Sequence, residues 1–249
     1  MYECFRDKVA LVTGGGTGMG AATALMLGRQ GAKVVIAGIE KDPVQAVAYQ
    51  IKEEGGQALA VQADVALPGA NKRMVEQAVE RFGGLHYAVN NAGVSGRFGS
   101  VEDIEVAEWR RVMAIDLDSI FYGLKYEVPA IIASGGGAIV NIASVYANLG
   151  FRRLDAYTAA KHGVKGLTRS AALEYADKGV RINAVSPGPI WTPMADEHPK
   201  EMQQVIDRTA AGRMGRPEEV ANVTLFMLSD QASFMIGTEV LVDGGLSLQ

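Results

Sequence analysis

Short runs of nearly continuous apolar residues alternate along the chain with longer stretches in which apolar residues recur at helical spacing. Strands that are apolar on both faces are typical of a parallel sheet covered by helices on both sides. The alternation therefore predicts repeated βαβ units. The expected strands are 8–13, 33–37, 58–63, 86–90, 138–143, 180–185 and 239–243. The expected helices are 18–30, 43–54, 68–82, 105–133, 155–178 and 217–229.

The 249 residues form one predicted domain, because no linker, repeat or low-complexity segment divides them. We expect an α/β fold over residues 1–249, a doubly wound Rossmann-type parallel sheet of about seven strands with helices on both faces. The least regular segment, at about 189–216, is interrupted by prolines and glycines. An insertion after a late strand tends to lie over the carboxyl edge of the sheet, so we expect a substrate loop there.

Composition narrows the class of protein. Hydrophobic residues make up 48% of the chain and charged residues 21%, which is typical of a globular protein with a large core. A net charge of -4 without a basic cluster disfavours nucleic acid and acidic membranes as partners. A single cysteine, Cys4, cannot form an internal disulfide, and no apolar run has the length of a signal or membrane segment. We expect a cytoplasmic protein with a small-molecule partner and no metal site.

A glycine-rich segment, TGGGTGMG at residues 13–20, follows the first expected strand and begins the first expected helix. Glycines allow a tight turn and bring backbone N–H groups close to a pyrophosphate, and the helix N-terminus adds a favourable dipole. The order of strand, glycine loop and helix is the one that a dinucleotide site requires. We therefore expect a dinucleotide to bind there.

Tyr157 and Lys161 stand four positions apart in the segment DAYTAAKHG, residues 155–163. Residues at this spacing are neighbours on one helical face, so the ammonium of Lys161 is expected near the phenol of Tyr157. A nearby cation favours the phenolate and lowers the tyrosine pKa from its usual value of about 10. The pair is a candidate general acid/base.

Several motifs resemble those of the short-chain dehydrogenase/reductase family. The glycine loop has the spacing TGxxxGxG of that family. The other matching motifs follow in the family's order along nearly the whole chain: Asn90-Asn91-Ala92-Gly93 as NNAG, Ser144 before the YxxxK pair Tyr157 and Lys161, and Pro187-Gly188 followed by Thr192.

The resemblance implies an NAD(P)-dependent oxidoreductase that interconverts a ketone and a secondary alcohol by hydride transfer. It implies that Tyr157 is the general acid/base and that Ser144 holds the reacting oxygen. Lys161 would lower the Tyr157 pKa and bind the nicotinamide ribose. The expected cofactor contacts, besides Tyr157 and Lys161, are Gly14, Thr17, Gly18, Met19, Gly20, Gly38, Ile39, Asp64, Val65, Asn90, Ala92, Gly93, Pro187, Gly188, Ile190 and Thr192.

Asp116, in the segment WRRVMAIDLDSIFYG, departs from the family pattern. The family usually has an asparagine there, whose backbone carbonyl holds a water that completes a catalytic tetrad. An aspartate keeps the carbonyl, but it lacks the amide donor and adds a negative charge. We include Asp116 among the catalytic residues. If it lies near Lys161, its charge should weaken the effect of Lys161 on Tyr157 and move the pH optimum upward.

The end of the second expected strand leaves the choice between NAD and NADP open. Family members that prefer NAD generally have an acidic residue at the place of Gly38, and those that prefer NADP often have an arginine at the place of Ile39. Lys41 could reach a 2′-phosphate, whereas Glu40 could bind the adenosine ribose instead. We expect a slight preference for NADP, or use of both cofactors.

The resemblance also indicates the substrate wall. The expected substrate contacts are Ser144, Tyr146, Leu149, Tyr157, Trp191 and Met194, with Phe151 beside them. Such a wall favours a medium-sized hydrophobic ketone or alcohol. The alternatives are a 3-oxoacyl-thioester reductase and a non-catalytic NAD(P)-sensing regulatory protein, the latter disfavoured by the presence of Ser144, Tyr157 and Lys161. Family members are commonly tetramers, so we expect a homotetramer.

Overall fold

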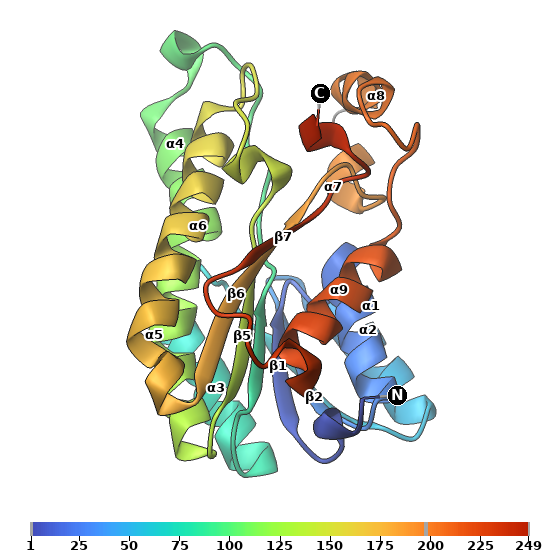
Figure 1. Cartoon of the computed structure of the whole chain (residues 1–249), viewed down its shortest axis with the longest axis vertical. Helices are drawn as coiled ribbons and strands as arrows, with labels where there is room; N and C mark the ends of the chain where they lie inside the picture. Colours follow the sequence, from blue (N-terminus) through green and yellow to red (C-terminus); the bar gives the residue numbers. More distant parts are fainter. Residues whose placement is uncertain (1, 197–198, 249) are drawn as a thin grey trace.

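The structure is a computed structural model that describes residues 2–196 and 199–248 (Figure 1). In this part of the chain one parallel sheet has the strand order β3-β2-β1-β4-β5-β6-β7. The strands are Val9–Thr13 (β1), Lys33–Gly38 (β2), Gln57–Gln62 (β3), Tyr87–Asn90 (β4), Gly137–Ile142 (β5), Val180–Pro187 (β6) and Glu239–Val242 (β7).

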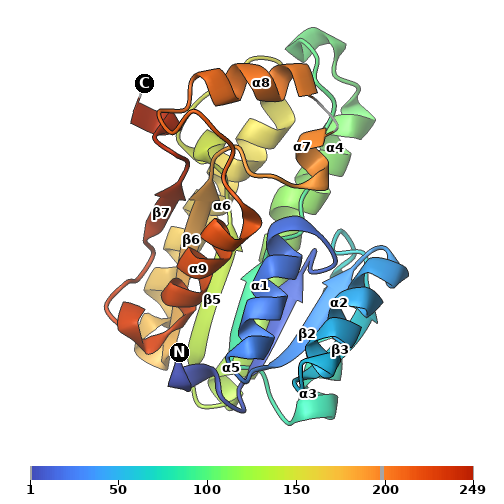
Figure 2. The same ribbon diagram turned by 90° about the vertical axis from the view of Figure 1, so that its right-hand side faces the viewer.

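Helices cover both faces of the sheet (Figures 1 and 2). One face carries α1, α2 and α9, and the other carries α3, α5 and α6. The helices are Gly18–Arg29 (α1), Lys41–Glu53 (α2), Pro68–Phe82 (α3), Val106–Met113 (α4), Ser119–Ala133 (α5), Asp155–Tyr175 (α6), Pro193–Asp196 (α7), Pro199–Asp207 (α8) and Pro217–Leu228 (α9). The predicted doubly wound, Rossmann-type sheet is confirmed.

The apolar strands supply a core on each side of the sheet, as β1 illustrates. Val9 and Leu11 pack with the cluster under α3, α5 and α6, whereas Ala10 and Val12 pack with the cluster under α1, α2 and α9. Successive side chains of a strand point to opposite faces, so a strand buried on both sides must be apolar throughout. Full burial of each valine or leucine contributes about 1.5–3 kcal/mol. This is why the near-continuous apolar runs predicted the strands well.

One expected element is wrong. The segment 105–133 is not one α-helix, because α4 and α5 are joined by a π-helical segment, Ala114–Asp118, that contains Asp116. The other predicted helices and strands begin and end within three residues of the observed bounds. π-helical turns inserted in α-helices are frequent at functional sites, and this one places the buried Asp116 beneath the loop that follows β4.

The topology brings the predicted motifs to one edge. The chain leaves β1 toward β2, yet β4 lies on the other side of β1, so the sheet has its switch point between β1 and β4. Ligands of open α/β sheets bind in the crevice outside the carboxyl ends of the strands at such a point. The glycine loop after β1 and the NNAG segment after β4 meet there. Over the neighbouring ends of β5 and β6 lie α7 and α8, from the expected substrate loop, whose residues 197–198 lie outside the described residues.

Candidate active site

The glycine loop is folded so tightly that none of its five glycines can be replaced without a shift of neighbouring atoms, as Gly14 and Gly20 illustrate. Gly14 has a φ of +60°, and a Cβ there would lie 2.9 Å from the Cα of Ala92. A Cβ at Gly20 would lie 2.1 Å from the carbonyl oxygen of Gly14. Thr17 is exposed and Gly18 is partly exposed at the start of α1. A close turn that opens onto a helix N-terminus fits the pyrophosphate of a dinucleotide.

Side chains near β4 hold this loop in place. The backbone N–H groups of Asn91 and Ala92 donate to Thr13 Oγ1 at 3.0 and 3.2 Å. The Asn91 amide donates to the carbonyl oxygens of Thr13 and Gly14 at 3.0 and 3.2 Å. Thr13 and Asn91 thus position the loop. Both residues belong to the TG and NNAG motifs, but we did not assign this role to them from the sequence.

Asn90 was expected to contact the cofactor, but its side chain points into the core. Its amide donates to Glu127 Oε2 and to Asn141 Oδ1, both at 3.0 Å, and Asn141 in turn donates to Thr168 Oγ1 at 2.9 Å. All four side chains are buried. The Asn90 side chain is therefore committed to a polar network that joins β4, β5, α5 and α6.

The adenosine end of the expected site has few recognition groups. A Cβ at Gly38 would lie 2.9 Å from Val44 Cγ1, so a side chain there would require the Val44 side chain to shift. β2 ends at Gly38 and Glu40 stands at the N-cap position of α2, so Glu40 lies outside the strand that carries Gly38. Ile39 is exposed. Asp64 Oδ1 accepts a hydrogen bond from the Ala66 N–H at 2.9 Å in a turn.

Val65, another expected contact, has a side chain that is buried in the core. Only its backbone is left for a role at the adenosine end.

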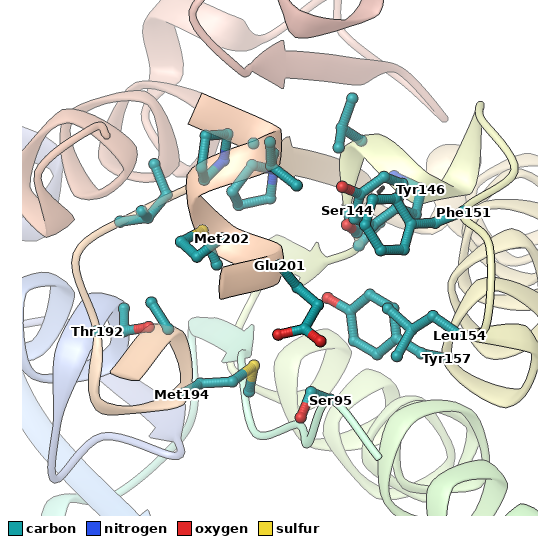
Figure 3. A pocket seen from close by; sticks show the side chains of 18 of the residues that line it. Ser95, Ser144, Tyr146, Phe151, Leu154, Tyr157, Thr192, Met194, Glu201 and Met202 are labelled. Carbon is teal, nitrogen blue, oxygen red and sulfur yellow. Dashed lines mark hydrogen bonds between the residues drawn. The ribbon is translucent and has the colours of Figure 1, made fainter. Parts of the chain in front are cut away.

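Ser144 and Tyr157 meet at the floor of a pocket (Figure 3). Ser144 follows β5, and its Oγ accepts a hydrogen bond from the Tyr146 N–H at 3.2 Å. The Ser144 hydroxyl is also hydrogen-bonded to the oxygen of Tyr157, in the first turn of α6. The two hydroxyl groups therefore converge on one point.

Lys161 lies one turn after Tyr157, as its spacing predicted. Its Nζ is 5.4 Å from the centroid of the Tyr157 ring and donates to the Ile142 carbonyl oxygen at 3.2 Å. The side chain is buried.

Asp116 lies near Lys161 and is fully buried. Its Oδ1 accepts a hydrogen bond from the Val94 N–H at 2.8 Å, and its Oδ2 has no partner in the described part of the chain. A Cβ at Gly93 would lie 3.0 Å from Asp116 Oδ1 and 3.4 Å from Lys161 Nζ, so both charged groups border Gly93. Burial raises the pKa of Asp116 to about 6, although the charge of Lys161 and the Val94 N–H favour the carboxylate.

The expected lowering of the Tyr157 pKa is not found in this structure. Burial raises the pKa of Tyr157, the charge of Asp116 raises it further, and only the hydrogen bond from Ser144 opposes the rise. Lys161 instead lowers the pKa of Asp116. The physical reason is first the burial of the phenol and second the negative charge of Asp116, both of which disfavour the phenolate.

The pocket is mostly apolar and has a volume of about 810 Å³, counting the part that is open to solvent. This lies in the range of pockets that bind small molecules. Four of the expected substrate contacts line it, namely Ser144, Tyr146, Tyr157 and Met194, together with five expected cofactor contacts, Met19, Pro187, Gly188, Ile190 and Thr192.

Two expected substrate contacts are not brought to the pocket. Trp191 is 59% exposed and only its backbone is engaged, through a hydrogen bond to the Gly215 carbonyl oxygen. Ile190 faces the pocket in its place. Leu149 packs in a small cluster on Val145, Val205 and Leu246.

The sequence reasoning also missed several lining residues: Ser95, Phe98, Leu154, Ala195, Glu201, Met202 and Val205. The sequence does contain a signal that could have found the last three residues. They stand at i, i+1 and i+4 in the amphipathic α8, the spacing of one helical face.

Comparisons with known proteins agree with this geometry. A family model described as Enoyl-(Acyl carrier protein) reductase matches residues 14–247. The cyclohexanol dehydrogenase of Acinetobacter sp. (strain SE19) is 50% identical over 244 residues, which are 98% of this chain and 96% of that protein. The chain belongs to the short-chain dehydrogenase/reductase family. It is therefore an NAD(P)-dependent oxidoreductase.

Two further similarities bear on the substrate and the fold of this short-chain dehydrogenase/reductase. The cis-4-hydroxycyclohexanecarboxylate dehydrogenase of Sinomonas cyclohexanicum is 40% identical over 246 residues, 98% of each chain. The crystal structure of a short-chain type dehydrogenase/reductase from Mycobacterium marinum superposes with a TM-score of 0.95 at 31% identity, covering 98% of this chain and 97% of that chain.

In the described residues no helix is both long and apolar enough to cross a membrane. No group of three or more histidine, cysteine, aspartate or glutamate side chains in these residues is arranged to hold a metal ion.

Proposed function

We propose that this enzyme interconverts a ketone and a secondary alcohol carried on a six-membered alicyclic ring, with cyclohexanol and cyclohexanone as the simplest pair. The observation that carries the proposal is the convergence of the Ser144 and Tyr157 hydroxyls at the floor of an apolar pocket beside the glycine loop. Two relatives act on cyclohexane rings that bear a hydroxyl group, which supports this substrate class.

The cofactor that fits the loop is a nicotinamide dinucleotide, which gives or accepts the hydride when bound. The loop from Gly14 to Gly20 and the start of α1 would hold its phosphates. Ala92, Gly93 and Lys161 would hold the nicotinamide ribose, and the segment from Pro187 to Thr192 would lie along the nicotinamide. Gly18 packs against Thr192, since a Cβ at Gly18 would lie 2.9 Å from Thr192 Cγ2. The two halves of the cofactor site therefore adjoin.

In the reaction Ser144 donates a hydrogen bond to the reacting oxygen, and Tyr157 takes the proton of the alcohol or returns it to the ketone. The raised pKa of Tyr157 keeps the phenol protonated near neutral pH, which suits its role as a proton donor in ketone reduction. Lys161 keeps a positive charge beside both Tyr157 and Asp116. The apolar walls fix the ring and exclude water, so that the barrier is lowered by positioning and by hydrogen bonds to the developing oxyanion.

For the cofactor we propose a slight preference for NADP with NAD also used. Gly38 offers no acid to the adenosine ribose, a side chain there would press on Val44, and Lys41 begins α2 nearby. Parallel fluorescence titrations with NADPH and NADH test this. Lys41→Glu should weaken NADPH binding while NADH binding changes little. Equal effects on the two affinities would show that Lys41 does not discriminate between NADPH and NADH.

We further propose that the enzyme acts as a cytoplasmic homotetramer. Phe121 on α5 and Leu173 on α6 are apolar and exposed, as are Phe234 and Leu248 near the carboxyl end. Exposed apolar residues on two long neighbouring helices support packing against another copy. Light scattering of the purified protein measures the oligomeric state, and a monomer would refute this part of the proposal.

The function is tested with a panel of substrates: cyclohexanol, a linear secondary alcohol of the same carbon number, and a 3-oxoacyl thioester. The proposal predicts the highest kcat/KM for cyclohexanol. A preference for the thioester would instead favour the alternative of a 3-oxoacyl-thioester reductase.

A further inference from the structure

One acidic side chain lines the otherwise neutral pocket. Glu201 extends from α8 toward the space beside Tyr157, Met194 and Ser95 (Figure 3). The remaining lining residues are apolar, glycine, or side chains with a hydroxyl group, and in the described part of the chain the lining includes no lysine, arginine or histidine. Glu201 is thus the one charged side chain among the described residues that line the pocket.

The carboxylate of Glu201 is not used by the protein itself. Among the described residues it takes part in no hydrogen bond and no ion pair. Its side chain is half-buried. Two charged groups at the opposite, carboxyl end of α8 are engaged elsewhere or exposed. Asp207 accepts a hydrogen bond from Gln203 at 2.8 Å, and Arg208 is exposed, with its charge felt by the Tyr146 phenol.

We propose that Glu201 is a specificity-determining residue. It accepts a hydrogen bond from a second hydroxyl group on the alicyclic ring, and it repels a ring that carries a carboxylate. The substrate class is therefore a neutral cyclohexanol, and best of all a cyclohexanediol. This inference deepens the proposed function and rests on it for the turnover experiment below.

Physical chemistry supports both halves of the proposal. A carboxylate next to apolar walls is poorly solvated, so a hydrogen bond from a ligand hydroxyl to it is stronger than the same bond in water. Two like charges in one small pocket repel more strongly than in bulk solvent, because the effective dielectric constant is lower. The relative that acts on cis-4-hydroxycyclohexanecarboxylate accepts an anionic ring, whereas Glu201 makes this pocket unfavourable for one.

The first experiment compares kcat/KM for cyclohexanol, trans-1,4-cyclohexanediol and cis-4-hydroxycyclohexanecarboxylate in the wild type and in Glu201→Gln. Asp207→Asn removes the same charge from the same helix outside the pocket and is the control. Glu201→Gln should raise kcat/KM for the carboxylate by about tenfold or more, because it removes a like charge from the same small pocket. It should also reduce the advantage of the diol over cyclohexanol, while Asp207→Asn changes neither ratio.

Ionic strength gives a second readout that a merely structural role of Glu201 would not move. Added salt screens charge repulsion, so it should raise the relative rate with the carboxylate in the wild type but not in Glu201→Gln. Unchanged substrate ratios in Glu201→Gln, at low and at high salt, would overturn the proposal.

A binding experiment separates this inference from the proposed function. With NADPH bound, the shift in Tm caused by cyclohexanecarboxamide is compared with the shift caused by cyclohexanecarboxylate, two ligands of the same shape that need no turnover. The wild type should be stabilised by the carboxamide only, and Glu201→Gln by both. If this pattern holds but no cyclohexanol is oxidised, the proposed function fails while charge selection by Glu201 stands. Equal stabilisation of the wild type by both ligands would refute the role of Glu201.

Discussion

Replacing Asp116 by asparagine isolates the effect of one buried charge on the candidate acid/base. Asparagine has nearly the same shape, and its side-chain oxygen can still accept the hydrogen bond that Asp116 Oδ1 accepts from the Val94 N–H. The change therefore removes the charge and leaves the packing in place. Asp116 raises the pKa of Tyr157, so the asparagine variant should have a lower Tyr157 pKa.

The expected size follows from Coulomb's law. A carboxylate and a phenolate taken as about 7 Å apart, at an effective dielectric constant of about 20, repel by about 2.4 kcal/mol, or about 1.7 pKa units. Lys161 borders Gly93 together with Asp116 and offsets part of this repulsion. We therefore expect Asp116→Asn to lower the Tyr157 pKa by about one unit.

The sign of the rate effect depends on the direction of the reaction. Alcohol oxidation needs the phenolate as base, so its rate rises with pH through the Tyr157 pKa, and the variant should reach this rise at lower pH. The wild-type Asp116 has a pKa of about 6 and becomes neutral below it, so the two profiles should converge at acidic pH.

The assay is the pH dependence of kcat/KM for cyclohexanol oxidation at saturating cofactor, from about pH 5.5 to pH 10. Asp118→Asn, which changes an exposed aspartate of the same π-helical segment, is the control and should leave the profile unchanged. Superposable profiles of the wild type and Asp116→Asn, or a shift of the variant to higher pH, would refute the reasoning.

Three further predictions concern the loop, the core and the pocket wall. Gly20→Ala places a Cβ 2.1 Å from the Gly14 carbonyl oxygen, so fluorescence titration should show NADPH affinity reduced at least about tenfold. Burial raises the pKa of Glu127 from 4.5 to about 7, so the native state keeps a proton that the unfolded chain loses, and stability should fall by up to about 3 kcal/mol as pH rises through this window. Urea unfolding should show a smaller fall for Glu127→Gln, and an equal fall would exclude Glu127 as its source. Finally, Trp191→Ala should leave the KM for cyclohexanol within about twofold of the wild type, because Trp191 is exposed. Phe151→Ala truncates a lining side chain and should raise this KM. The reverse result would show that Trp191, and not Phe151, contacts the substrate.

Much of the fold could be predicted from the sequence, because strands buried on both faces must be apolar along their whole length. The parallel arrangement of these strands also explains why the predicted motifs lie together. Parallel strands end at one edge, so the residues that follow β1, β4, β5 and β6 had to become neighbours. The helical spacing of Tyr157 and Lys161 likewise fixed their contact.

What could not be predicted involves polar groups whose environment depends on the tertiary structure. The apolar periodicity continues through 114–118, so it gives no sign of the π-helical segment. Glu127 is buried and accepts a hydrogen bond from Asn90, and this pairing of residues from β4 and α5 leaves no signal in the local sequence pattern. At the pocket, the family resemblance indicated Trp191, yet the backbone turns Ile190 inward. The local sequence around Glu201 is typical of a solvent-exposed helix, and only the position of α8 over the pocket shows that Glu201 lines it.

The central claim is that Tyr157 transfers the proton during oxidation of an alicyclic alcohol with a nicotinamide cofactor. The most direct measurement is the formation of reduced nicotinamide by the wild type and by Tyr157→Phe with cyclohexanol, together with the Kd of each for NADPH. The account predicts saturable turnover by the wild type, and for the variant a kcat at least about a hundredfold lower with nearly unchanged NADPH affinity. Turnover by Tyr157→Phe close to that of the wild type would contradict it.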